Sequence, residues 1–296
     1  MVLLFQHTLT SNLSEGVVIE GQNSVALTNC TLTANTTQTN SNAQFLDAVI
    51  LYQSMSGDAD SGTSSFTMTG GVISNQSGHV FHVTNTNAVI ELNNVNIVDN
   101  GDGVFLSVCD DGWSGASNVA TLNASGQTLS GDILIGNDST LTLNLSDSST
   151  FTGNISGVIS NNNGTSISTE LGTVNVTLDE TSKWYLSGDT YISSFSGTAA
   201  NVITGGYTLY VDGVALEGTS EDDDGGSDDG GSDDSGSDDD SDYGSDSNEI
   251  YNESNGVSIN GGASDDSINN NGSNVTINGG AGDDSISKNQ CSQTFE

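Results

Sequence analysis

Apolar and polar residues alternate along most of the first 217 residues. A period of two places successive side chains on opposite faces of a β-strand, whereas a helix needs a period near 3.6. Three such runs align with coinciding apolar positions, and a second alternating run follows each of them. The first runs are 24–34, 65–74 and 89–98, and their followers are 48–54, 79–84 and 103–108. The pattern therefore predicts short strands and no long helix.

The alternating runs repeat loosely, as the coils of a solenoid do. Coils of about 20–30 residues are typical of a β-solenoid, and Asn29 and Asn94 share a register with Gly70 between them. Each coil would cover the apolar face of its neighbour. We therefore predict an all-β, right-handed parallel β-helix over 1–217, with asparagine side chains stacked at equivalent turns. A β-sandwich is the alternative architecture.

The end of the chain has a nine-residue repeat. Isoleucine recurs at 250, 259, 268, 277 and 286. The template G-G-x-G-x-D-x-U-x, where U is a large apolar residue, describes a calcium-binding β-roll. Residues 279–287 fit it throughout, and residues 261–269 have Ser264 in place of the third glycine. We predict a short parallel β-roll over 248–296, with two nonapeptides in each coil.

This register predicts a calcium site. Asp266 and Asp284 are eighteen residues apart, so they would stack on one edge of the roll. Two carboxylates at the spacing of neighbouring coils repel each other, and a Ca²⁺ ion between them makes the interaction favourable. The opposite edge has Val257 and Val275 instead, so we expect about one ion; the alternative is a turn without metal. The expected ligands are Gly261, Gly262, Ser264, Asp266, Gly279, Gly280, Gly282 and Asp284.

Charge excludes some partners. The chain has 39 acidic residues and 2 basic ones, a net charge of −37. It therefore offers no basic surface for nucleic acid, and anionic lipid should repel it. Residues 218–247 hold thirteen of the acids and one large apolar residue, Tyr243. We predict a disordered, extended spacer there, with a diffuse calcium reservoir as the alternative.

The cysteines and histidines give no metal motif. Cys30, Cys109 and Cys291 lack metal-site spacing, and their odd number argues against a disulfide framework. We expect the three histidines, His7, His79 and His82, on polar faces of strands.

The composition is typical of an extracellular protein, although no signal peptide is visible. No run approaches the roughly 18 apolar residues of a membrane-spanning segment, so we expect no membrane insertion. The expected setting is extracellular or cell-surface. Two explanations fit the missing signal peptide: the chain is truncated, or it is exported by a route without a cleaved leader. We expect a monomer or part of a longer chain.

Several segments resemble known families. Residues 48–71, 81–97 and 112–118 resemble bacterial adhesin-like surface proteins with a pectin-lyase-type β-helix, and 183–216 resembles the closing segment of that domain. The resemblance covers about 1–217. It implies secreted or surface-displayed proteins, described as adhesin-like or carbohydrate-binding, without established catalytic residues. The tail separately resembles RTX-type calcium β-rolls.

The residues favour binding over catalysis. Pectate-lyase-type elimination needs an arginine or lysine base, and the chain has no arginine and only Lys183 before the tail. The clearest candidate ligand-binding residues are Asp110, Asp111 and Trp113; a solvated loop is the plainer interpretation. Trp184 could pack in the core or stack on a sugar. Ice binding would need a regular Thr-x-Thr array, of which only fragments occur.

We therefore expect a non-enzymatic adhesin-like protein with calcium-stabilised C-terminal repeats. Its partners would be glycans, or host or cell-surface molecules. The alternatives are a carbohydrate-binding module and a polysaccharide lyase or hydrolase of the β-helix class.

Overall fold

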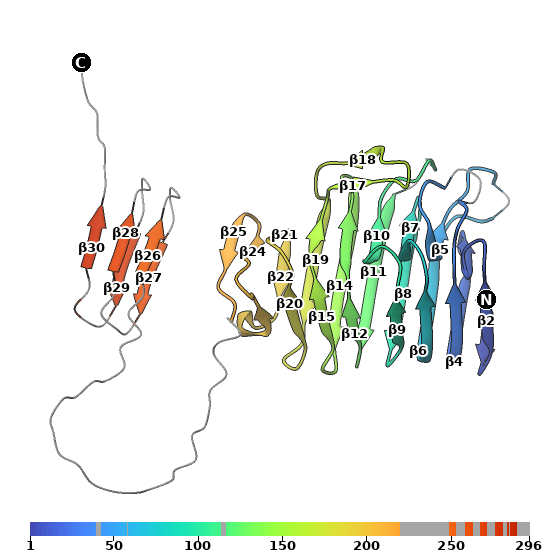
Figure 1. Cartoon of the computed structure of the whole chain (residues 1–296), viewed down its shortest axis with the longest axis horizontal. Helices are drawn as coiled ribbons and strands as arrows, with labels where there is room; N and C mark the ends of the chain where they lie inside the picture. The colour runs from blue at the N-terminus through green and yellow to red at the C-terminus, as the bar shows by residue number, and fades with distance from the viewer. Residues whose placement is uncertain are drawn as a thin grey trace, which may run out of the picture. The chain divides into compact units, whose positions relative to one another are not determined.

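The computed structural model describes two units of the chain, within residues 1–226 and 227–296 (Figure 1). The described residues are 1–39, 43–57, 59–113 and 117–219, and in the tail 249–252, 258–262, 267–270, 276–280, 283 and 285–288. Residues 220–248, which include most of the predicted spacer, lie outside them. Thr219, at the start of that spacer, still pairs with Ile203.

The first unit is a parallel β-helix, as the sequence predicts. Its largest sheet, sheet A, has ten strands, and successive coils pair in parallel. Parallel pairing excludes the β-sandwich alternative, whose sheets are antiparallel. The strands of sheet A are β1 (Val2–Phe5), β2 (Thr8–Ser11), β4 (Ser24–Ala34), β6 (Thr63–Asn75), β8 (Asn87–Asn93), β9 (Asn96–Asp99), β11 (Asn118–Ser125), β14 (Ser139–Ser146), β19 (Thr173–Leu178) and β22 (Ser194–Ser196).

Two further parallel sheets complete the coils. Sheet B has six strands and contributes the second long wall. Its strands are β3 (Val17–Glu20), β5 (Asp47–Tyr52), β7 (His79–Thr84), β10 (Val104–Val108), β13 (Asp132–Ile135) and β16 (Ile155–Ser156). Sheet C has four, namely β12 (Thr128–Ser130), β15 (Thr150–Gly153), β20 (Lys183–Leu186) and β23 (Val202–Ile203).

Shorter elements depart from the coils. β17 (Ile159–Ser160) and β18 (Ser166–Ser168) form an antiparallel pair. A three-stranded sheet contains β21 (Thr190–Ile192), β24 (Leu209–Val211) and β25 (Val214–Leu216). The one helix among the described residues is the 3₁₀ turn η1 (Ala199–Asn201), and no helix there has the length and apolar character to cross a membrane.

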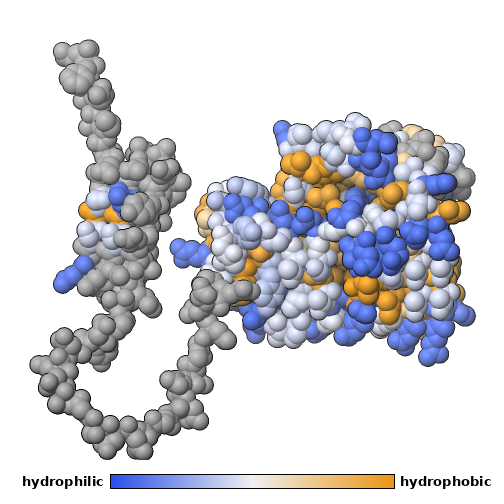
Figure 2. Space-filling model, viewed as in Figure 1, coloured by the Kyte–Doolittle hydropathy of each residue, from blue (hydrophilic) through white to orange (hydrophobic). Residues whose placement is uncertain are grey.

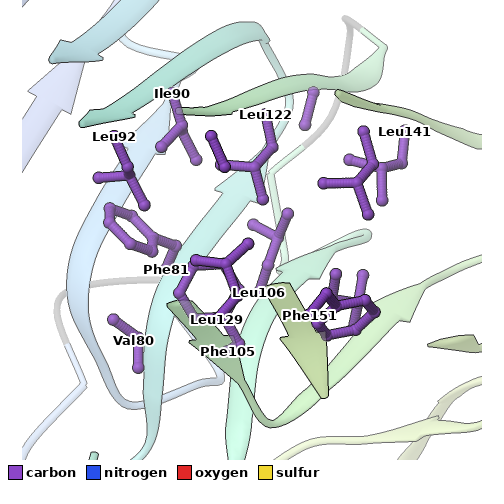
Figure 3. Packing of buried hydrophobic residues seen from close by; sticks show 14 of the residues in the cluster. Val80, Phe81, Ile90, Leu92, Phe105, Leu106, Leu122, Leu129, Leu141 and Phe151 are labelled. Atoms are coloured by element: carbon purple, nitrogen blue, oxygen red, sulfur yellow. The ribbon is translucent and has the colours of Figure 1, made fainter. Parts of the chain in front are cut away.

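The core is a continuous column of inward-facing side chains (Figure 3). Phe81 lies edge-to-face between Phe66 and Phe105, with ring centroids 5.5 and 5.6 Å away. Trp184 is fully buried, stacks on Phe151, and donates its indole N–H to the carbonyl of Gly153 at 3.0 Å. The core interpretation of Trp184 is therefore confirmed.

One bend of sheet A places left-handed residues in register from coil to coil. Asn29, Gly70 and Asn94 occupy equivalent positions there, with φ of 51°, 62° and 50°. A Cβ on Gly70 would lie 2.4 Å from Oδ1 of Asn29, so this column alternates asparagine with glycine. The predicted register of these three residues is confirmed.

The second unit repeats every eighteen residues, as predicted. Ile250 pairs with Ile268 and Ile268 with Ile286 on one side, and Ile259 pairs with Ile277 on the other. All of these pairings are parallel. The strands are β26 (Glu249–Asn252), β27 (Ser258–Gly262), β28 (Ser267–Asn270), β29 (Thr276–Gly280) and β30 (Ser285–Lys288).

Candidate functional site

The predicted calcium residues fall partly within the described tail. Gly261 and Gly262 end β27, Gly279 and Gly280 end β29, and Gly262 pairs with Gly280. These four glycines are thus in register at the ends of two paired strands, which fits the predicted donor set. The other four, Ser264, Asp266, Gly282 and Asp284, lie outside the described residues. Calcium binding stays a prediction. In the part of the chain that the structure describes, no three His, Cys, Asp or Glu side chains are placed to hold a metal.

The three predicted ligand-binding residues of the first unit do not form one surface. Asp110 is exposed and accepts a hydrogen bond from Asn118 at 2.9 Å. Asp111 is fully buried, so the expectation of a solvated loop is wrong for it. Trp113 is half-buried, with its ring centroid 5.1 Å from that of Tyr52.

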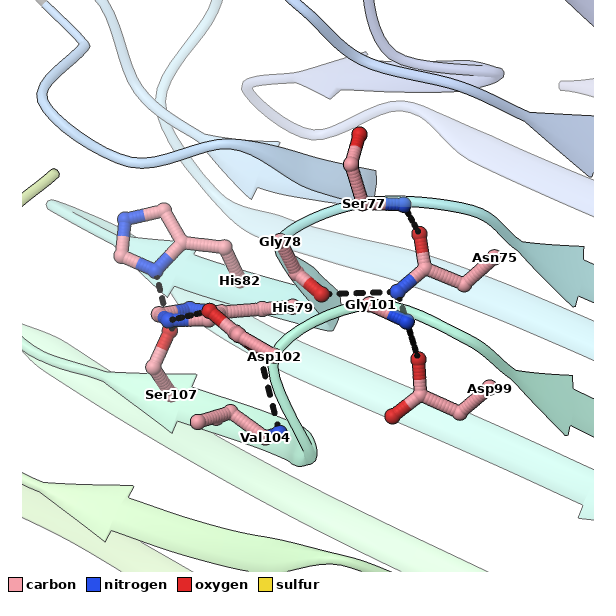
Figure 4. Close-up of polar contacts among 10 residues, drawn as sticks. All are labelled: Asn75, Ser77, Gly78, His79, His82, Asp99, Gly101, Asp102, Val104 and Ser107. Atoms are coloured by element: carbon pink, nitrogen blue, oxygen red, sulfur yellow. Dashed lines mark hydrogen bonds and ion pairs between the residues drawn. The ribbon is translucent and has the colours of Figure 1, made fainter.

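The expectation that the histidines lie on polar faces is wrong for two of them. His79 and His82, both on β7, are buried, and each places Nδ1 against the hydroxyl of Ser107, at 2.7 and 2.6 Å (Figure 4). Ser107 is opposite His82 in the pairing of β10 with β7. The register of two neighbouring coils therefore brings these side chains together.

A carboxylate lies at each end of this group. His79 Nε2 is 3.4 Å from Asp102 Oδ2, and His82 Nε2 is 3.2 Å from Asp111 Oδ2. The Asp102 side chain is 43% exposed, whereas that of Asp111 is 0% exposed. We call the series Asp102–His79–Ser107–His82–Asp111 the histidine relay. It connects a solvent-facing carboxylate with a buried one.

Hydrogen bonds fix the turns that precede β7 and β10. The Asn75 amide donates to the carbonyl of Gly78 at 2.7 Å and to Asp99 at 2.8 Å. Asp99 also accepts the Gly101 N–H at 2.9 Å (Figure 4). These contacts hold the turns that carry His79 and Asp102 beside each other.

Residues Ala43–Leu46, which we call the cover, lie over the relay. The Phe45 ring packs 5.2 Å from His79 and 5.0 Å from His82, and the Gln44 N–H donates to Asp111 Oδ1. Asn161, next to β17, donates to the Gln44 side chain at 2.8 Å. Phe45 also joins Cys109 and Ile159 in a small second core. The outer face of sheet B is therefore enclosed here.

Two more carboxyl groups are buried nearby. Asp47 is 0% exposed, and neither of its carboxylate oxygens has a hydrogen-bond partner. Burial raises the pKa of Asp47 well above its usual value, and the charges of Glu15 and Asp111 raise it further. Burial also raises the pKa of Glu15, although its backbone hydrogen bond opposes that shift. An ionised carboxylate is costly at either position.

Burial acts in the opposite direction on histidine. It lowers the pKa of His79 to about 3, with a further contribution from His82. His79 is therefore neutral at physiological pH. Burial likewise raises the pKa of the Cys109 thiol, so Cys109 is an unreactive thiol while it stays covered.

The relay contains a serine, a histidine and an aspartate in the order that activates a nucleophile. Ser107 is 0% exposed beneath the cover, however, so its hydroxyl does not reach a substrate in this structure. Its place in a closed polar network makes it a structural hydroxyl here.

The outer face of sheet A carries an open groove of about 440 Å³. Neighbouring strands place Thr67, Glu91, Asn123 and Asn144 side by side along it. Thr67 donates to Glu91 at 3.1 Å, and Asn144 donates to Asn123 at 2.9 Å. Much of the face seen in Figure 2 is likewise polar or weakly polar, interrupted by smaller apolar areas.

No family model, curated protein or solved structure matches the chain. The resemblances to adhesin-like and RTX-type proteins therefore stay predictions.

Proposed function

We propose that the chain is a non-enzymatic, adhesin-like protein of the cell surface or extracellular space, whose β-helix binds a neutral glycan on the outer face of sheet A. The groove of about 440 Å³ is the observation that carries this proposal. Its polar lining comes from Thr, Ser, Asn and one Glu on consecutive coils. These side chains supply both donors and acceptors, as the hydroxyl groups of a sugar require.

Charge supports a neutral ligand. The chain as a whole carries −37, and Glu91 is the one ionisable residue that lines the groove. A uronate or sulfated sugar would meet repulsion without a compensating cation. The coils repeat at about 4.8 Å, so an extended glycan along the groove would meet similar polar groups in succession.

The same lining favours binding over hydrolysis. Glycosidases of most families use two carboxyl groups, one on each side of the scissile bond. Glu91 has no second carboxyl group among the groove-lining residues to act with it. We therefore keep the lyase or hydrolase class as the alternative that an activity assay decides.

Calcium and location belong to the same proposal. Extracellular modules bind Ca²⁺ with dissociation constants on the order of 10⁻⁴–10⁻³ M. The tail would then fold in the calcium of the extracellular space and stay loose at cytosolic levels. The in-register glycines at the ends of β27 and β29 support this assignment.

A glycan array tests the binding, followed by calorimetry with the best neutral oligosaccharide. Asn123→Leu and Asn144→Leu change outward-facing side chains on sheet A and should reduce affinity at least tenfold. Thr152→Leu makes a similar change at an exposed position of sheet C and should leave affinity unchanged. The proposal fails if no neutral glycan binds, if both groove variants bind normally, or if the bound sugar is cleaved.

A further inference from the structure

The histidine relay has a proton count that restricts its hydrogen bonds. Both imidazoles place Nδ1 within 2.7 Å of the same hydroxyl, that of Ser107. A hydroxyl has one proton, so it can donate to one imidazole and must accept from the other. When both histidines are neutral, His79 and His82 are therefore opposite tautomers.

Burial decides in which direction the hydrogen bonds of the relay run. If Nε2 of His82 were unprotonated, its lone pair would face Asp111 Oδ2 at 3.2 Å, where both side chains are 0% exposed. Two acceptors in contact without water are unfavourable. The same mismatch at Asp102, which is 43% exposed, can be relieved by solvent. The donors thus run from His79 to Ser107 and from Ser107 to His82, which leaves the Nε2–H of His82 facing Asp111 Oδ2 at 3.2 Å without the geometry of a hydrogen bond.

The cover is attached to this network at several points. Gln44 N–H donates to the second oxygen of Asp111, and the Leu46 carbonyl accepts the His79 N–H at 2.8 Å. The chain then continues directly into Asp47, whose two carboxylate oxygens have no partner. The pairing of Val17 with Val49 places Glu15, two residues before β3, beside Asp47 of β5. Uncompensated carboxyl groups thus lie where the cover joins β5.

We propose that the cover is a proton-operated latch, closed while Glu15 and Asp47 hold protons and loosened when they ionise. Ionisation places two adjacent negative charges near Asp111, and no lysine or arginine pairs with a carboxylate among the described residues. The resulting repulsion acts at the junction of the cover with β5 and against the carboxylate that anchors Gln44. Separating these groups requires the cover to move outward and admit water.

Other titratable groups face the same region. They are His79 and His82 from β7, Asp102 from the turn before β10, and Cys109, Asp110 and Asp111 after it. Near neutral pH His79 is uncharged, because burial lowers its pKa to about 3. Burial raises the pKa of Glu15 and of Asp47, which moves their ionisation toward neutral pH.

Cys109 reports whether the cover is open, because it packs beneath Phe45. The test measures alkylation of Cys109 by iodoacetamide from pH 5 to 8.5 in the full chain, with mass spectrometry to locate the label. Asp47→Asn keeps the shape of the side chain and removes its charge, and Glu15→Gln is a second variant of the same kind. Comparing variants with the wild type at each pH cancels the intrinsic pH dependence of the reagent.

We expect the wild-type rate, relative to Asp47→Asn, to rise several-fold between pH 5 and 8.5. Glu15→Gln should reduce this rise, while Glu217→Gln, which removes an exposed carboxylate, should behave as wild type. Cys30, a buried thiol of the main core, is the internal reference and should stay unlabelled. A flat ratio overturns the proposal, and so does labelling of Cys30 in parallel with Cys109, which would indicate global unfolding.

Discussion

The side-chain amide of Gln127 takes the place of a neighbouring strand beside Val95. The amide donates to the Val95 carbonyl at 2.6 Å and accepts the Val95 N–H at 2.8 Å. No backbone hydrogen bond joins β9 to β12 within the described residues, and a cleft of about 600 Å³ lies between these strands. One buried side chain therefore satisfies the backbone of Val95 where β9 of sheet A and β12 of sheet C do not pair.

Removing this amide should destabilise the first unit. Gln127→Ala leaves the N–H and carbonyl of Val95 without partners, which costs about 1–3 kcal/mol for each buried group that water does not reach. Gln76→Ala, at an exposed glutamine, is the matched control and should cost less than about 0.5 kcal/mol. Urea unfolding followed by circular dichroism measures both. Equal losses in the two variants would contradict the assigned role of Gln127.

The strands could be predicted from the sequence because their cause is local. Alternation of apolar and polar residues decides which face of a strand is buried, and the repeat of the pattern decides which coils pair. The break between β9 and β12 has no such signal. The break depends on how far two coils separate on one side of the β-helix while they stay paired on the other sides. One glutamine among many polar residues does not reveal this separation.

The left-handed bend of sheet A gives a prediction about steric fit. Gly71 has φ of +88°, and an added Cβ would lie 2.1 Å from the carbonyl oxygen of Cys30. Gly103 has a similar φ of +81° but open space around the same position. Gly103→Ala should therefore cost about 1–2 kcal/mol from backbone strain alone.

Gly71→Ala should cost this amount and a further 1–3 kcal/mol or so, because the neighbouring coil must shift. Thermal and urea unfolding of the two variants separate the cost of backbone strain, which both share, from the cost of the steric clash, which only Gly71→Ala has. If Gly71→Ala is no worse than Gly103→Ala, the coils of this bend are not packed as closely as the structure indicates.

The lowered pKa of His79 predicts that the stability of the first unit depends on pH. Its pKa falls from 6.5 in the unfolded chain to about 3 in the folded one. Its contribution to stability is therefore present above about pH 6.5 and is lost as the pH falls toward 3, by up to about 1.4 kcal/mol per pH unit. His79→Asn retains an N–H donor toward Ser107 and does not titrate, so its stability relative to wild type should improve as the pH falls.

Urea unfolding at pH 7, 5.5 and 4.5 measures this difference. His7→Asn, at an exposed histidine, should keep a constant difference from wild type over the same range. A constant difference for His79→Asn as well would mean that His79 takes up its proton as readily in the folded chain as in the unfolded one.

The buried relay was beyond the reach of sequence reasoning for a physical reason. His82 has the parity of an outward-facing residue on β7, because Phe81 and Val83 fill the core on either side of it. An outward residue is normally polar and solvated, so the sequence predicts polar faces for the histidines. Burial instead comes from the cover and from the β17–β18 pair, which are distant in sequence and contact each other through Gln44 and Asn161.

The calcium prediction can be tested with a control inside the repeat itself. In the template, Asp266 is the ligand and its neighbour Asp265 is not. Titration of the full chain should show binding on the order of 10⁻⁴–10⁻³ M and a gain of β-signal in circular dichroism. Asp266→Asn should remove this transition, because one of the two stacked carboxylates that would flank the ion is lost. Asp265→Asn removes the same charge beside the site and should shift affinity less than about threefold, through the general field alone.

An unchanged spectrum at roughly 10 mM Ca²⁺, well above the expected range, would rule out the site. Equal losses in both variants would show that the acidic chain attracts calcium diffusely, without the stacked pair.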